Sequence, residues 1–510
     1  MDRRNFLQGT SALLALGSQL SFPAANAQEA DAPDGVMPFG PETVKAEARR
    51  LAGRDFEPPP TEDLPDALAE MGYDQYRDIR FRAEARIWSD RVSPFQVDLF
   101  HRGFLYREKV EIALVDNGTV RPVAFSPAMF DYGPGSPPED AGDIGFSGFR
   151  VRSLINTPGY WDEFLVFQGA SYFRAVARGQ NYGLSARGLS IDTAGPEGEE
   201  FPVFRKFWLE QPEPDAMTMV VHALLDSPST TGAYRFVIGG GAETLIDVDA
   251  EIYPRDEIAK IGLAPQTSMF MFNATNRAGF DDFRPAVHDS DGLQMLTGAG
   301  EWIWRPLANP VALQISNFQD DGPRGFGLMQ RARSFQDFED PEAAYERRPS
   351  LWIEPLGDWG KGSVELIEIP TELEIHDNIV AFWHPAERVE EGGSYAFAYR
   401  MRWTDEVSPQ LGMLVTKQTR IGVTIDGDRR LFVVDFASKN GVVPPNVTAH
   451  VSASAGDLRE PVIHGILADG TLRVSFELDT GDEDLIELRL VLRTGDTVTS
   501  ETWLYRWTPR

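Results

Sequence analysis

The sequence predicts an all-β protein with two domains, a large β domain followed by a smaller β-sandwich of the size of an immunoglobulin (Ig) domain. Apolar and polar residues alternate along 394–403, 471–478 and 486–492. A period of two gives a strand one buried and one solvated face, which in an antiparallel domain is typical of a sandwich. The length of 510 residues is enough for two large domains with their own cores.

Helices are expected to be few and short. Residues 43–51 form a charged helical pattern, and residues 64–79 repeat apolar side chains at near-helical spacing. Two further brief helices are expected at 256–261 and 341–346. The rest of the chain is interpreted as strands and turns.

Strands are expected from residue 79 onwards. A strand at 108–115 is followed by Asn117-Gly118, a dipeptide that supplies the positive φ of a hairpin turn. Proline, charged residues and Gly-Gly interrupt the strand pattern at 386–393. Further strands in the large domain are expected at 218–225, 234–238 and 244–252. The expected organisation is therefore a large domain over 34–385, a linker over 386–393 and an Ig-like domain over 394–510.

The first 27 residues have the pattern of a cleaved signal peptide. Arg3 and Arg4 precede a Phe-Leu pair, a weakly apolar run covers 11–20, and Ala25-Asn26-Ala27 forms a small-x-small cleavage site. The paired arginines are similar to a twin-arginine (Tat) signal, and an ordinary Sec signal is the alternative. Either signal predicts an exported, periplasmic protein without direct membrane insertion.

Charge and composition exclude several function classes. The chain carries 48 Lys and Arg against 78 Asp and Glu, a net charge of −30, so nucleic acid and anionic membranes are unsuitable partners. It has no cysteine, which excludes disulfides, thiolate catalysis and iron–sulfur clusters. The seven histidines have no HExxH spacing. We therefore expect no metal and no cofactor.

One segment has the composition of a sugar-binding site. Five of the eleven tryptophans lie between residues 302 and 383, among them Trp302, Trp352 and Trp359. Acidic clusters at 288–292 and 372–378 flank this segment. Aromatic rings can stack on sugar faces, and glycoside hydrolysis needs two carboxyl groups. Core packing of the tryptophans and solvated acidic turns are the alternatives, and spacing alone favours them over catalysis.

Several runs resemble the periplasmic glucan biosynthesis family of MdoG/OpgG and OpgD proteins. The similarity extends over essentially the whole mature chain. It includes the runs at 169–176, 182–189, 264–270, 300–303, 348–355 and 500–505, together with the Asp289 cluster. This resemblance implies a large galactose-mutarotase-like β-sandwich domain with a cleft, followed by a smaller Ig-like β-sandwich domain.

The resemblance also implies a function and a set of site residues. The family produces osmoregulated periplasmic glucans with a β-1,2-linked glucose backbone, and its D-type members resemble anomer-inverting β-1,2-glucanases. Residue by residue, Asp377 matches their general acid and Asp289 their general base, with Glu374 and Tyr345 at matching site positions. Substrate binding is expected from these last two residues and from Arg348, Trp302, Trp352 and Trp359.

Two features leave the type of activity open. D-type members have a long loop in the carboxy-terminal domain, whereas 417–430 is short here. The alternative to hydrolysis is an escort protein that binds nascent glucan, with the Ig-like domain docking on a membrane glucosyltransferase. If Asp377 is the general acid, we expect it to lie in a partly desolvated cleft, because an acid must retain its proton.

Overall fold

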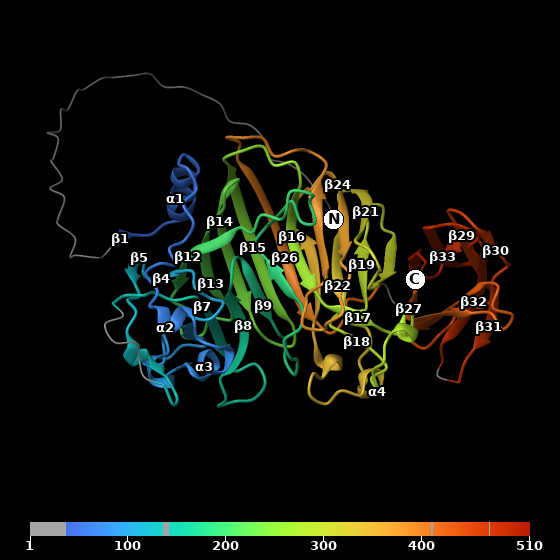
Figure 1. Ribbon diagram of the computed structural model, residues 1–510, viewed down its shortest axis with the longest axis horizontal. Coiled ribbons are helices and arrows are strands. Elements are labelled where there is room, and N and C mark those ends of the chain that lie inside the picture. The colour runs from blue at the N-terminus through green and yellow to red at the C-terminus, as the bar shows by residue number, and fades with distance from the viewer. Residues whose placement is uncertain (1–36, 136–141, 410–411, 469, 510) are drawn as a thin grey trace, which may run out of the picture.

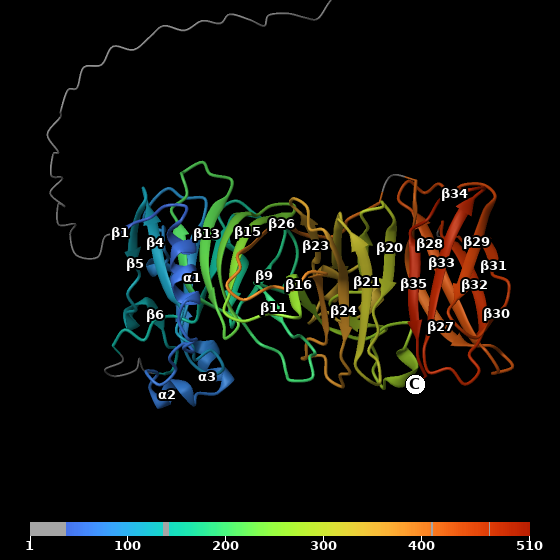
Figure 2. The ribbon, with the colours of Figure 1, turned by 90° about the horizontal axis from the view of Figure 1, so that it is seen from above.

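The computed structural model describes residues 37–135, 142–409, 412–468 and 470–509. The proposed signal peptide therefore lies outside the described residues. Strands dominate the described part of the chain, and the predicted all-β fold is confirmed. Figures 1 and 2 show a long molecule with the carboxy-terminal domain at one end and helices α1–α3 at the other.

The large domain is a sandwich of two mainly antiparallel sheets. The first, named the long sheet here, runs in the order β1 (Met37–Pro38), β5 (Thr119–Pro122), β4 (Glu111–Asp116), β12 (Val203–Glu210), β13 (Met219–Asp226), β14 (Thr230–Gly239), β15 (Thr244–Pro254), β26 (Tyr395–Thr404), β23 (Ser350–Pro355), β22 (Gly325–Met329), β19 (Gly292–Leu296) and β20 (Trp302–Pro306). The second runs in the order β21 (Gln314–Asp321), β24 (Lys361–Glu368), β25 (Ile379–Pro385), β16 (Ile261–Ser268), β10 (Ser185–Arg187), β9 (Tyr172–Ala175), β8 (Asp162–Gln168), β7 (Gly148–Ser153) and β3 (Gln96–Phe100), with β11 (Ser190–Ile191) beside β16.

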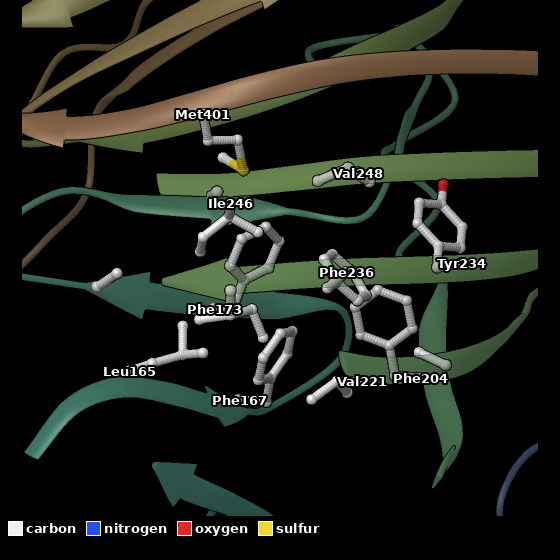
Figure 3. Close-up of a cluster of buried hydrophobic side chains, with 14 of the residues drawn as sticks. Leu165, Phe167, Phe173, Phe204, Val221, Tyr234, Phe236, Ile246, Val248 and Met401 are labelled. Carbon is white, nitrogen blue, oxygen red and sulfur yellow. The ribbon is translucent and has the colours of Figure 1, made fainter. Parts of the chain in front are cut away.

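The core of the sandwich lies between the facing sides of these sheets. Phe167 and Phe173 from the second sheet pack against Phe204 and Phe236 from the long sheet, with ring centroids of the contacting pairs between the sheets 5.3–6.3 Å apart. Figure 3 shows these rings pointing toward one another between the strands. Burial of such side chains contributes about 1.5–3 kcal/mol each relative to exposure, so this cluster fixes the sheets against each other.

The helices only partly match the expected ones. The predicted helix at 43–51 is confirmed as α1 (Thr43–Ala52), and the structure also contains α2 (Asp66–Ala69), α3 (Tyr73–Asp78) and α4 (Phe335–Phe338). The pattern at 64–79 forms two helices because Gly72 is extended, and glycine is a poor helix former. The helix expected at 256–261 was wrong, and of the one expected at 341–346 only a 3₁₀ turn at Tyr345–Arg347 is present. Ile258 instead forms a β-bridge to Val389, and Ala344 adopts a left-handed conformation that interrupts a helix.

The carboxy-terminal domain is a smaller two-sheet sandwich. Its first sheet contains β27 (Leu414–Val423), β28 (Arg430–Ser438), β32 (Leu472–Asp479), β30 (Asp457–Leu458) and β31 (Val462–Ile466). Its second contains β29 (Val447–Ala453), β33 (Ile486–Thr494), β34 (Thr497–Val498) and β35 (Thr502–Trp507). The short stretch 417–430 covers most of β27, the turn at 424–429 and the first residue of β28.

The expected domain boundary at 386–393 requires correction. Strand β26 follows this stretch, yet it pairs with β15 on one side and β23 on the other, in the middle of the long sheet. Its inward residues Tyr399, Met401 and Trp403 belong to the core of the large domain. The alternating pattern correctly predicted a strand, but a pattern of buried faces does not identify the sheet that a strand joins.

The two domains are joined by shared pairing and by a buried ion pair. Strand β35 pairs in parallel with β20, so that the long sheet continues into the carboxy-terminal domain. Arg331 donates to both carboxylate oxygens of the buried Glu501, at 2.7 and 3.0 Å, and its guanidinium lies 3.5 Å from the ring centroid of Trp304. These contacts hold the carboxy-terminal domain in one orientation.

Candidate functional site

The acidic clusters predicted from the sequence meet beside a small two-stranded sheet. This sheet pairs β17 (Phe270–Phe272) with β18 (Val287–His288), and Asp289 follows β18 directly. The second cluster occupies the loop between β24 and β25. Asn378, at the end of this loop, is buried, accepts from the N–H of Phe270 at 2.8 Å and donates to its carbonyl at 3.0 Å. The amide of Asn378 therefore ties the loop to the strand beside Asp289.

Asp289 is a buried carboxylate paired with an arginine. Only 4% of the residue is exposed, and Arg348 donates from Nη1 to its Oδ1. Burial raises the pKa of Asp289 to about 6 even though the Arg348 guanidinium lowers it, and the charge on Asp377 adds to the increase. Asp289 is thus ionised above about pH 6 and takes up a proton below it.

Arg348 is held between a glycine and a tyrosine. Its guanidinium lies 4.4 Å from the ring centroid of Tyr345. A Cβ added to Gly183 would lie 2.9 Å from the Cβ of Arg348, so only glycine leaves room for the arginine at this point. The position of Arg348, and with it the ion pair to Asp289, therefore depends on the run at 182–189.

A second set of contacts continues from Tyr345. Its hydroxyl donates to Glu374 Oε2 at 3.2 Å, and burial raises the pKa of Tyr345, which keeps the hydroxyl protonated. Arg284 lies 2.8 Å from the same Glu374 oxygen and also contacts Asp340 at 2.9 Å. Asp289, Arg348, Tyr345, Glu374 and Arg284 thus form one continuous polar cluster, named the carboxylate cluster here. The predicted positions of Asp289, Arg348, Tyr345 and Glu374 do come together.

Asp377 lies at the open side of this cluster. Its side chain is 34% exposed, and its Oδ2 is 3.6 Å from Nη2 of Arg174 on β9. The charge on Asp377 contributes to the raised pKa of Asp289, which places the two carboxylates within electrostatic range. Two thirds of the Asp377 side chain is thus covered, with the carboxylate of Asp289 near it, while its role as an acid stays a prediction. Asp289 is the more deeply buried of the two carboxylates, because Asp377 lies on an exposed loop.

The three tryptophans expected to bind substrate pack elsewhere. Trp352 is 2% exposed and stacks on Trp302 with centroids 5.7 Å apart, against the core of the carboxy-terminal domain. Trp359 donates to the carbonyl of Ala398 and packs near Trp383. The alternative of core packing holds for Trp352, and none of the three contacts the carboxylate cluster.

Two arginines of the site were missed by sequence reasoning. Arg174 falls within the run at 169–176, but its contact with Asp377 joins a strand to a loop that is distant in sequence. Arg284 carries no local signal, because an arginine in a charged loop has the same pattern whether it is solvated or paired. In the described ranges, no three His, Asp or Glu side chains are grouped to hold a metal ion. Nor does any helix there have the length and hydrophobicity needed to span a bilayer.

Comparison with known proteins identifies the family. Residues 39–507 match the family described as "Periplasmic glucan biosynthesis protein, MdoG". The chain belongs to the MdoG family. Proteins named "Glucans biosynthesis protein G" from Shewanella sp. (strain MR-7) and, as protein G 1, from Shewanella oneidensis are each 50% identical over 477 residues, which cover 92% of this chain and 87% of the relative. A protein G from Shewanella baltica (strain OS155) is 50% identical over 476 residues. Membership of the MdoG family assigns the chain to periplasmic glucan biosynthesis.

Proposed function

We propose that this member of the MdoG family acts in the periplasm on the β-1,2-linked glucose backbone of osmoregulated periplasmic glucans. Its activity is that of an anomer-inverting endo-β-1,2-glucanase that trims or processes the chains. Asp377 is the general acid and Asp289 the general base, while Tyr345, Glu374 and Arg348 position the sugar. The observation that carries the proposal is a buried carboxylate and an open carboxylate facing one site.

The environment of Asp289 suits a base. A general base must be ionised when water attacks, and it works best when its pKa is close to the operating pH. The pKa of Asp289, raised to about 6 by burial, satisfies both conditions near neutral pH. The proton can reach Asp289 directly from the attacking water or through a chain of hydroxyls and waters.

The surroundings of Asp377 have to change when the glucan binds. A general acid has to carry a proton when the leaving oxygen arrives, and in the free protein Asp377 is open to water and beside Arg174. The bound glucan must therefore cover this carboxyl group and separate it from Arg174. The exposed loop that carries Asp377 leaves room for such a displacement.

Hydrolysis of linear β-1,2-glucan, followed by release of reducing ends, tests the proposal. Asp377→Asn and Asp289→Asn should each lower turnover by about 10²–10⁴-fold, with glucan binding retained. The anomeric configuration of the first product, read by NMR, should be inverted. Asp249→Asn, an exposed carboxylate on the outer face of β15, is the control and should keep full activity. Wild-type turnover in Asp377→Asn would remove Asp377 from the mechanism.

The second candidate is a glucan-binding escort protein that presents nascent glucan to branching or substituting machinery. The exposure of Asp377 and its ion pair with Arg174 favour it, because binding needs no protonated carboxyl group. In this case the carboxy-terminal domain would dock on the membrane glucosyltransferase. Binding of β-1,2-glucan without hydrolysis by the wild type would support the escort function over the glucanase.

A further inference from the structure

A hollow in the large domain is lined by residues of β7, β8, β9 and β12 and by the segment that precedes β4. It has a volume of about 430 Å³ and is named the end pocket here. Its walls include Tyr106, Tyr172 and Phe201, and its polar lining includes Glu108 and Gln168. Its inner end reaches Phe204 and Phe167, which belong to the core seen in Figure 3. The floor of the pocket is therefore formed by core side chains, which packing holds in place.

Strand β9 connects the end pocket to Asp377. Tyr172 and Arg174 are two residues apart on this strand and point to the same face, about 6.6 Å apart along it. Arg174 contacts Asp377 at 3.6 Å, whereas Tyr172 lines the pocket. The charge on Asp377 is one of the influences on the pKa of Tyr172, which burial raises. Along the long axis of the molecule, β9 lies between α3 and the β17–β18 pair (Figure 1). One face of β9 therefore carries both a wall of the pocket and the arginine that contacts Asp377.

The aromatic walls of the end pocket are held in place. The guanidinium of Arg187 lies 4.7 Å from the ring centroid of Tyr172 and 5.6 Å from that of Phe201. Arg187 is itself fixed by an ion pair with Glu199 and by a hydrogen bond to Thr267 Oγ1 at 3.0 Å. Rings held in this way lose little conformational entropy when a ligand stacks on them.

The pocket offers both an apolar surface and a free acceptor. Phe201 is 49% exposed, which is unusual for a ring on a wall that is otherwise fixed. In the described part of the chain, the carboxylate of Glu108 has no ion-pair or hydrogen-bond partner, and burial raises its pKa. A ring beside a free carboxylate matches the apolar face and the hydroxyls of a sugar.

We propose that the end pocket is a distal subsite that binds glucose units of the same glucan chain whose backbone lies at Asp289 and Asp377. This inference rests on the proposed action on β-1,2-glucan and adds a contact beyond the reacting bond. Phe201 and Tyr172 stack on sugar rings, and Glu108 accepts their hydroxyls. Binding energy gained here makes the protein prefer long chains to short ones.

Binding of β-1,2-gluco-oligosaccharides of increasing length tests the subsite. Calorimetry on the full-length Asp377→Asn protein, which prevents cleavage, should give tighter binding for long chains than for short ones. In this background Phe201→Ala should weaken the binding of long chains by roughly 2- to 10-fold and leave short chains unchanged. Glu108→Gln should act in the same direction without removing an apolar side chain, so it serves if Phe201→Ala does not fold.

Tyr160→Ala is the matched control, because Tyr160 is also an exposed aromatic residue but precedes the opposite end of β8 from Gln168. It should leave all affinities unchanged. If both pocket variants keep the full preference for long chains, the subsite is refuted, although the glucanase can still stand. If they lose it while the wild type hydrolyses nothing, the subsite stands and the glucanase fails. A wild type that binds no β-1,2-glucan refutes both.

Discussion

Replacing Arg348 by Gln should move the acid limb of the activity profile to higher pH. Arg348 lowers the pKa of Asp289 against the effect of burial, and the pKa that results is about 6. An opposite charge at contact distance shifts a carboxyl pKa by about 1–3 units, and a shift of about 1–2 units is expected for the loss of this single charge. Without this charge the pKa of Asp289 should rise to about 7–8. The base would then be protonated, and so inactive, over a pH range where the wild type works.

The size of the effect follows from the titration of one group. At pH 6 about half of Asp289 is ionised in the wild type, whereas a pKa raised by about 1–2 units leaves roughly 10% to 1% ionised. Activity at pH 6, relative to each protein's own plateau at high pH, should therefore fall by about 5- to 50-fold. The measurement is kcat/KM for β-1,2-glucan across pH, because this ratio reports the groups of the free enzyme.

Arg347→Gln is the control for this experiment. Arg347 is the neighbouring residue and is exposed, so its loss removes the same charge without uncovering Asp289. Its acid limb should stay near that of the wild type. If the acid limb of Arg348→Gln stays at the pH of the wild type or moves to lower pH, Asp289 is not the group whose ionisation controls activity. Normalising each profile to its plateau separates this effect from any loss of substrate binding.

Three further predictions concern the substrate, the domain junction and export. Affinity for β-1,2-glucans should exceed that for β-1,3- and β-1,4-linked chains in calorimetry, since a different linkage presents successive rings at a different angle; equal affinity for cello-oligosaccharides would contradict this. Glu501→Gln should lower stability by about 3 kcal/mol, because it leaves Arg331 without its counter-charge; thermal unfolding measures this, Asp496→Asn on an exposed turn is the control, and an unchanged melting temperature would refute it. Changing both Arg3 and Arg4 to Lys should retain folded protein in the cytosol if the signal is of the twin-arginine type, and continued export through Sec in a fractionation assay would exclude that route.

Local sequence patterns predicted where strands and turns occur better than they predicted which strands pair with one another. The hairpin at Asn117-Gly118 is present, with both residues at positive φ between β4 and β5, because a turn depends on the conformation of two residues. The sheet joined by β26 could not be predicted in the same way. Alternation specifies that one face is buried, whereas the choice between two cores depends on contacts with distant strands.

The residues of the candidate site were also predicted with unequal success. Asp289, Tyr345, Arg348 and Glu374 were identified through the family resemblance, and the structure places them in contact. The tryptophans were chosen for their composition alone, and a ring that suits a sugar also suits a core. Trp352 is buried for this reason, since the hydrophobic effect does not distinguish a binding platform from a packing residue.

The central place of β26 also affects how the chain can fold. Strand β15 and strand β23 belong to two halves of the long sheet, and β26 is the strand that hydrogen-bonds to both. Ile252 pairs with Tyr395, so this contact must wait until most of the chain has been synthesised. Pairings so distant in sequence carry a high cost of loop closure and slow the search for the native state. Until that step the inner edges of both halves are unpaired and open to association with other chains.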